Sequence, residues 1–98
     1  MNIDKQFQEE KLTVKVSGRL DTTTAPELEA SLNESFDGID KLEMNFEELE
    51  YISSAGLRVL LSAQKVMNQK GGMTVVGVND TIMEIFEVTG FSDILTIE

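Results

Sequence analysis

Apolar residues near the start of the chain recur with a period of two. Leu12, Val14 and Val16 alternate with polar residues, which is typical of a strand with one buried face. A charged turn at residues 9–11 separates this strand from an extended piece before it. The two extended pieces are therefore expected to pair antiparallel at the start of the fold.

Helical spacing of three and four replaces this alternation in three later segments. Residues 21–36 are predicted to form a helix with Thr24 or a neighbouring threonine as its N-cap and Pro26 near its first position. Residues 56–70 carry a wide apolar stripe, which predicts a well-buried helix, and two glycines end it. Residues 79–90 predict the third helix, which opens on the capping pair Asn-Asp. Its apolar stripe consists of Ile82, Ile85, Phe86 and Val88.

Further strands are predicted between and after these helices. Residues 41–46 alternate, residues 73–78 form a continuous apolar run that suits burial on both faces, and residues 94–98 form a last short strand. Residues 47–51 are interpreted as a loop. This order predicts one α/β domain over residues 1–98. Its sheet is expected to be mixed and mostly parallel, with an antiparallel first strand and helices packed on it.

Composition limits the chemistry available to this domain. The 98 residues include no cysteine and no histidine, which removes disulfides, thiolate ligands, the common zinc ligand and the usual general base. No catalytic group, metal or cofactor is therefore expected. The net charge of −10 argues against nucleic acid and anionic membranes as direct partners, and it is compatible with a basic protein partner. Without a membrane-length apolar run or a signal peptide, a cytoplasmic monomer is expected.

The candidate site is the stretch YISSAGLRVLL, residues 51–61, where a strand region becomes the second helix. In an open α/β sheet, functional groups gather at the carboxyl ends of the parallel strands. The loops there are expected to place a group of polar residues at one edge of the sheet. This group consists of Asp21, Thr22, Thr23, Thr24, Ser53, Ser54 and Asp80.

Ser53 and Ser54 have two interpretations. A serine at a helix start is most simply an N-cap, which stabilises the helix by about 1 kcal/mol. However, the small neighbours Ala55 and Gly56 leave these hydroxyls open to an approaching macromolecule. A phosphate there would suit the helix dipole and would add about −1.5 to −2 charges to the surface. Such a phosphate would block an interface and leave the fold intact.

Two long segments carry a resemblance to a known family. VSGRLDTTTAPELEASL and LEMNFEELEYISSAGLRVLLSAQKVMNQKGG resemble the STAS domain of bacterial anti-sigma factor antagonists, and the similarity extends over nearly the whole chain. In these antagonists the helix junction usually reads aspartate, serine, serine or threonine, glycine, leucine. Ser54 falls on the phosphorylated serine, and Gly56 and Leu57 match the glycine and leucine. Ser53 stands where the family has aspartate, and Ala55 follows the acceptor.

The resemblance implies a partner-switching function. In this family the unphosphorylated antagonist binds an anti-sigma factor, which is a serine kinase of the GHKL-type ATPase fold, and thereby frees a sigma factor. The kinase phosphorylates the antagonist to end the interaction, and a serine phosphatase resets the switch. The face implied to dock on the kinase consists of Asp21, Thr22, Thr23, Ser53, Ser54, Gly56 and Arg58.

Alternatives to this interpretation remain open. Ser53 is a second candidate acceptor, although the alignment favours Ser54. The chain is also compatible with a constitutive STAS interaction or ligand-binding module that phosphorylation does not control. A small acidic carrier protein with a phosphopantetheine arm is a further class. Carrier proteins are all-helical, however, and the predicted strands at residues 12–17 and 73–78 argue against that class.

Overall fold

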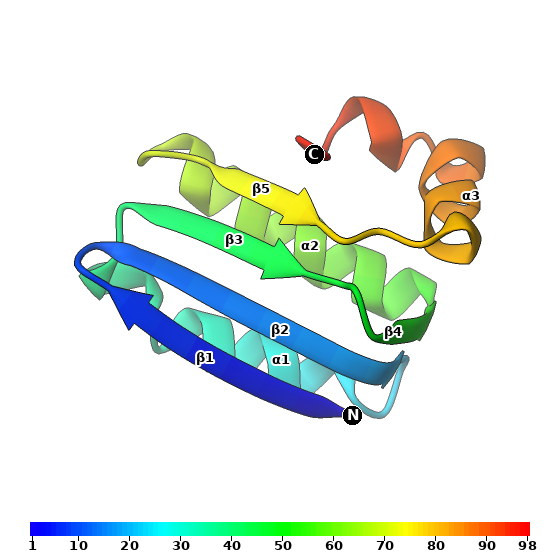
Figure 1. Cartoon of the computed structure of the whole chain (residues 1–98), viewed down its shortest axis with the longest axis horizontal. Helices are drawn as coiled ribbons and strands as arrows, with labels where there is room; N and C mark the ends of the chain where they lie inside the picture. The colour runs from blue at the N-terminus through cyan, green and yellow to red at the C-terminus, as the bar shows by residue number, and fades with distance from the viewer.

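The computed structural model describes residues 1–98 as a five-stranded sheet with three α-helices (Figure 1). The strands are β1 (Asn2–Gln8), β2 (Lys11–Leu20), β3 (Lys41–Asn45), β4 (Leu49–Ile52) and β5 (Met73–Val76). The helices are α1 (Ala25–Asn33), α2 (Ser54–Asn68) and α3 (Asp80–Thr89), with short 3-10 turns at Phe36–Gly38 and Phe91–Asp93. The predicted α/β class is confirmed. None of the helices is long and apolar enough to cross a membrane.

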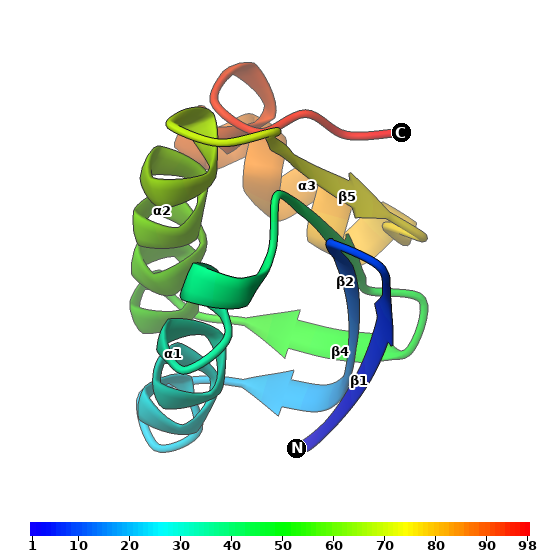
Figure 2. The same cartoon turned by 90° about the vertical axis from the view of Figure 1, so that its left-hand side faces the viewer.

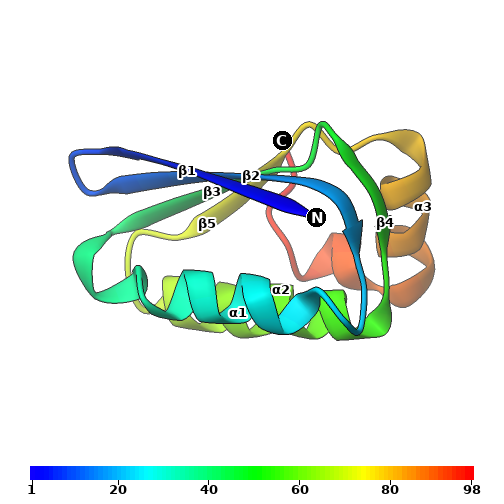
Figure 3. The same ribbon diagram turned by 90° about the horizontal axis from the view of Figure 1, so that it is seen from below.

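The sheet is mixed, as the sequence predicts. Its main order is β1-β2-β3-β5, with β1 antiparallel to β2 and the remaining pairs parallel. The ten-residue strand β2 pairs with β3 along its first half and with β4 along Gly18–Leu20. Within the pairing with β4 the register shifts between Gly18 and Arg19, and Gly18 has a φ of +88°. Because glycine accepts positive φ without steric cost, β2 bends there, and β4 follows the bend (Figure 3).

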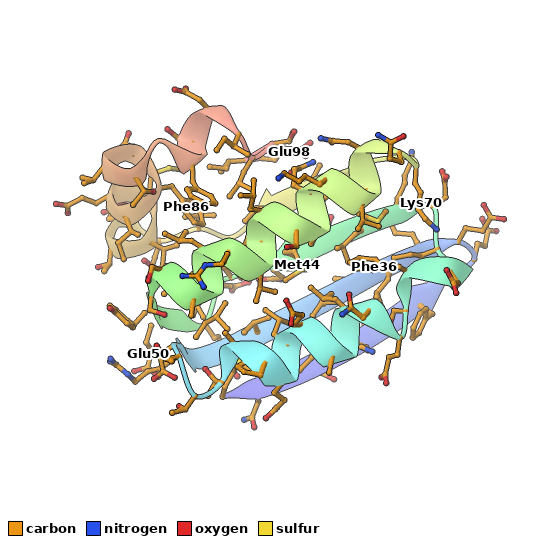
Figure 4. All side chains as sticks on the ribbon, turned by 180° about the vertical axis from the view of Figure 1, so that it is seen from behind. Phe36, Met44, Glu50, Lys70, Phe86 and Glu98 are labelled. Carbon is orange, nitrogen blue, oxygen red and sulfur yellow. The ribbon has the colours of Figure 1, made fainter.

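The helices cover one face and one end of the sheet. Helices α1 and α2 lie side by side against the sheet (Figures 2 and 3), while α3 lies beside β4 at the end (Figure 3). Leu12, Val14 and Val16 of β2 are fully buried beneath the helix layer, and Met44 of β3 lies in the same core (Figure 4). The alternating polar residues of β2 face the open side of the sheet.

Several local predictions were wrong. Residues 49–52 form strand β4 instead of a loop. In β5 only Met73 and Val75 are buried, because helices cover only one face of the sheet. The last predicted strand is reduced to a single bridge between Val75 and Ile97. The predicted N-cap position of Thr24 in α1 is confirmed, but its hydroxyl makes no capping hydrogen bond and instead donates to the Arg19 carbonyl at 2.8 Å.

Two lysines tie the ends of helical segments to the rest of the domain. Lys5 of β1 donates to the Ser31 carbonyl at 2.7 Å and to the Ser35 hydroxyl at 2.8 Å, near the C-terminus of α1. Lys70 donates to the carbonyls of Phe36 and Ile39, and Figure 4 shows Lys70 and Phe36 close together. These contacts lie at the end of the molecule away from the start of α2.

Candidate partner-binding site

The backbone at the start of α2 is fixed by the end of the neighbouring strand. Ser53 is the N-cap residue and has extended dihedrals of φ −97° and ψ 177°. Its N–H donates to the Leu20 carbonyl at 2.9 Å, and its carbonyl accepts from the Leu57 N–H at 2.9 Å. The Ser53 hydroxyl, in contrast, is buried and has no hydrogen-bond partner. Ser53 therefore holds the N-cap position without capping the helix through its side chain.

Ser54 differs from Ser53 in accessibility. It is the first residue of α2 and is exposed. The first turn of a helix carries unpaired N–H groups and the positive end of the helix dipole, so this position accepts negative charge favourably. Ser54 is therefore accessible to solvent, whereas the Ser53 oxygen is buried.

Gly56 allows this first turn to pack closely on the sheet. The residue is buried, and a Cβ at this position would lie 2.8 Å from Ile52 Cγ1 and 2.8 Å from Leu20 Cγ. Such distances are shorter than any ordinary contact between carbon atoms. The glycine thus brings the start of α2 directly against the ends of β2 and β4.

A groove lies between the start of α2 and helix α3. Its volume is about 430 Å³. Ser53, Ser54 and Leu57 line it from α2, and Val88 on α3 is 80% exposed at its side. We call it the α2–α3 groove. Its other lining residues are Tyr51, Ile52, Thr81, Glu84, Ile85 and Thr89.

A second hollow lies on the other side of α2, against α1. Its volume is about 220 Å³, and it includes Thr22, Ala55 and Arg58. The separation follows from helix geometry. Successive residues point about 100° apart, so Ser54 and Leu57 face α3 whereas Ala55 and Arg58 face α1.

The loop between β2 and α1 is organised by one carboxylate. Asp21 Oδ1 accepts hydrogen bonds from the Thr23 hydroxyl at 2.8 Å, the Thr23 N–H at 3.0 Å and the Thr24 N–H at 3.2 Å. The Thr23 hydroxyl is the main reason why the pKa of Asp21 lies below its ordinary value. The ionised form of the Asp21 side chain therefore stabilises this loop.

Arg19 connects this loop to the α2–α3 groove. Its guanidinium lies 4.5 Å from the centre of the Tyr51 ring, which lines the groove. Its Nε is 3.9 Å from Asp21 Oδ2. Sequence analysis did not single out Arg19, because its contact with Tyr51 depends on the pairing of β2 with the unpredicted strand β4.

The predicted site residues thus fall into separate groups. Ser53 and Ser54 line the α2–α3 groove, and Thr22 and Arg58 line the hollow against α1. Asp21 and Thr23 form the loop contacts described above. Gly56 is buried, and Asp80 lines neither hollow.

Sequence analysis also missed the contribution of α3 to the groove. Glu84, Ile85 and Val88 line it. Val88 is one of the apolar residues expected along this helix, and it is exposed, whereas Ile82 and Phe86 are fully buried. The sequence shows an apolar residue near the end of this helix. Periodicity alone, however, does not tell whether that residue lies in the core or on the surface.

The comparisons with known proteins cover nearly the entire chain. Residues 2–98 match the family model of the STAS domain. The chain belongs to the STAS domain family. This STAS domain is 36% identical over 97 residues to the anti-sigma-B factor antagonist of Staphylococcus aureus, covering 97% of this chain and 90% of that protein.

Solved structures share the fold of this STAS domain. A crystal structure of an anti-sigma factor antagonist from Mycobacterium paratuberculosis matches with a TM-score of 0.88 at 23% identity, covering 98% of this chain and 83% of that one. The Bacillus cell fate determinant SpoIIAA in its phosphorylated form matches with a TM-score of 0.78 at 16% identity, covering 99% of this chain and 91% of that one. At these identities the likeness shows a common fold.

Proposed function

We propose that this STAS domain is an anti-sigma factor antagonist that acts by partner switching. In its unphosphorylated form it binds an anti-sigma factor with a GHKL-type serine kinase fold and so frees a sigma factor. Phosphorylation of Ser54 blocks this binding, and a serine phosphatase restores it. The observation that carries the proposal is the exposed Ser54 beside the α2–α3 groove, in a chain 36% identical to a named anti-sigma-B factor antagonist.

Accessibility favours Ser54 over Ser53 as the phosphate acceptor. A kinase must bring the γ-phosphate of ATP into line with the attacking hydroxyl. The exposed Ser54 permits that approach, whereas the Ser53 oxygen is buried against the end of the sheet. ATP and the catalytic groups belong to the kinase, and this chain acts as its substrate.

A phosphate on Ser54 would change the interface more than the fold. Its charge would lie at the positive end of α2, where the dipole is favourable to anions. It would also project beside apolar Leu57 in the groove, where a partner could cover it only by removing its hydration. Structures of SpoIIAA in its phosphorylated and unphosphorylated forms both share the fold of this chain, each with a TM-score of 0.78.

The proposed docking face surrounds the start of α2 on both sides. Its residues are Asp21, Thr22, Thr23, Ser53, Ser54, Gly56 and Arg58, of which buried Gly56 contributes by positioning the helix. The net charge of −10 favours a partner with a basic rim and increases the rate of encounter more than the affinity. We place this interaction in the cytoplasm, with the domain acting as a monomer.

A phosphorylation assay tests the proposal. The protein is incubated with ATP and each purified GHKL-type kinase of its source organism, and the product is analysed by intact mass and peptide mapping. We expect a single phosphate at Ser54 that is absent from Ser54→Ala. Ser53→Ala serves as the matched control and should still be phosphorylated. Stable binding to a kinase without any phosphate transfer would contradict the switch.

One departure from the family pattern favours a second candidate function. Ser53 occupies the position where these antagonists usually carry aspartate, and its hydroxyl makes no contact that replaces a carboxylate. A constitutive STAS interaction module would not require that carboxylate. Ser54→Asp separates the two functions, because it should weaken kinase binding in a switch and leave partner binding unchanged in a constitutive module.

A further inference from the structure

We propose that Arg58 forms an ion pair with the phosphate on Ser54, so that this chain itself binds the group that switches it. The pair would join two residues on the surface of α2 and would need no partner protein. This inference rests on the proposed function and assigns a further residue, Arg58, to the phosphorylated state of the same site.

Helix α2 places Arg58 one turn after Ser54. Both residues are exposed, and four positions separate them within the helix. Residues at this spacing lie about 40° apart around the helix axis, with their Cβ atoms about 5–6 Å apart. Ser54 lines the α2–α3 groove and Arg58 lines the hollow against α1, so the two side chains lie on either side of the same ridge. The long arginine side chain can therefore reach a phosphate on Ser54.

Arg58 carries a charge that no carboxylate of the chain neutralises. Its side chain takes part in none of the salt bridges of the domain. The other arginine, Arg19, already lies over the Tyr51 ring and beside Asp21. A phosphate on Ser54 would offer Arg58 an anion whose oxygens match the planar guanidinium, which can donate two parallel hydrogen bonds to it.

The chain is strongly acidic overall, but the sequence around Ser54 is not. None of the 18 acidic residues lies between positions 51 and 68. Acidic side chains approach from the neighbouring helices instead, because Glu84 of α3 lines the groove and Glu29 of α1 lines the hollow beside Arg58. A phosphate carries about −1.5 to −2 charges at neutral pH, so it attracts Arg58 more strongly than the single charge of Glu29 does.

The ion pair would change the proposed docking face at two positions. Arg58 is the one basic residue of that face. Pairing with the phosphate would neutralise Arg58 at the same time as Ser54 gains its negative charge. Phosphorylation would thus remove a cation from the face as well as add an anion to it.

Phosphorus NMR of the modified protein tests the inference. Phosphoserine is incorporated at position 54 during translation, so no kinase is needed, and the second pKa of the phosphate is measured by titration. A paired cation favours the dianion and lowers this pKa below its ordinary value of about 6. We expect Arg58→Gln to raise the pKa by about 0.2–0.5 pH units relative to the wild type. Arg58→Lys keeps the positive charge and should raise it less.

Lys65→Gln is the matched control. It removes the same charge from an exposed position of the same helix, about 16 Å further along the axis. The pKa of the phosphate should therefore be nearly the same in Lys65→Gln as in the wild type. Because Arg58 and Lys65 are exposed and take part in no salt bridge, all variants should melt close to the wild type.

The outcomes separate this inference from the proposed function. An equal phosphate pKa in the wild type and Arg58→Gln would overturn the ion pair. An equal rise in Arg58→Gln and Lys65→Gln would overturn it as well, because the effect would then follow from net charge alone. If no kinase phosphorylates Ser54, the proposed function fails, whereas the titration still decides whether Arg58 binds the phosphate.

Discussion

Ser53 and Ser54 are adjacent in sequence, yet only Ser54 is exposed, while the Ser53 Oγ is buried without a hydrogen-bond partner. The difference arises because Ser53 is the extended residue that joins β4 to α2 and bonds through its N–H to the end of β2, whereas Ser54 is the first residue of the helix. The two hydroxyls therefore have different roles. Ser54 is the proposed acceptor, and Ser53 is a structural residue whose hydroxyl makes no stabilising hydrogen bond within the chain.

Ser53→Ala should leave the stability of the domain nearly unchanged or raise it slightly. Removal of a serine that caps a helix costs about 1 kcal/mol, but removal of an unpaired buried hydroxyl has little cost. Urea denaturation measures the free energy of unfolding. A loss of about 1 kcal/mol or more would show that the hydroxyl caps α2 in solution.

Gly56→Ala should destabilise the domain by about 1–3 kcal/mol. Alanine normally stabilises a helix relative to glycine, but here its Cβ would lie 2.8 Å from Ile52 and Leu20 side-chain carbons. Gly38→Ala is the matched control, because a Cβ at Gly38 meets no atom within 4 Å. Chemical denaturation of both variants checks the prediction. Equal stability of the two variants would rule out close packing at the start of α2.

Lys5→Met should lower the free energy of unfolding by about 1–2 kcal/mol. The substitution removes the donor to the Ser31 carbonyl and to the buried Ser35 hydroxyl near the end of α1. Lys11→Met removes only a solvent-exposed ion pair at 3.4 Å and should cost less than about 0.5 kcal/mol. Urea denaturation measures the free energy of unfolding of both variants, and the loss should be larger for Lys5→Met. A larger loss for Lys11→Met would contradict the assigned role of Lys5.

The pKa of Asp21 should depend on the Thr23 hydroxyl. This hydroxyl donates to Asp21 and lowers its pKa, so Thr23→Val should raise the pKa toward the ordinary value of 3.8. Thr22→Val is the control and should leave the pKa unchanged. An NMR titration of the Asp21 carboxyl carbon measures both variants, and an unchanged pKa in Thr23→Val would contradict the loop geometry.

The same hydrogen bonds determine how stability depends on pH. Because the folded-state pKa of Asp21 is lowered, its contribution is fully present above the unfolded-state value near 3.8. That contribution is lost as the pH falls through the folded-state pKa. Asp21→Asn should therefore be less stable than the wild type at neutral pH, and this difference should shrink in acid. A difference in stability between the two proteins that grows in acid would contradict this prediction.

The sequence predicted the elements whose side chains repeat regularly. The alternation of Leu12, Val14 and Val16 identified β2, and the wide stripe of residues 56–70 identified most of α2. It missed β4, which has only four residues and which pairs with β2 only along Gly18–Leu20. A strand this short carries too little periodicity to be distinguished from a loop.

The candidate site was only partly predictable for a related reason. Ser54 was found from its place at a helix start, which is a local property. The separation of Ser54 from Arg58 into two hollows depends on where α1 and α3 pack around α2. The exposure of Val88 depends on the same packing. These packing relationships join residues far apart in the sequence, and no local pattern in the sequence predicts them.

The most direct test of the account measures kinase binding by the phosphorylated protein. The unmodified protein, the Ser54-phosphorylated protein and Ser54→Asp are each titrated with the purified anti-sigma kinase, and their melting temperatures are compared. We predict that phosphorylation weakens binding by at least about tenfold while the melting temperature stays nearly constant. Equal affinity of the phosphorylated and unmodified proteins would contradict the switch, as would a loss of binding that accompanies unfolding of the domain.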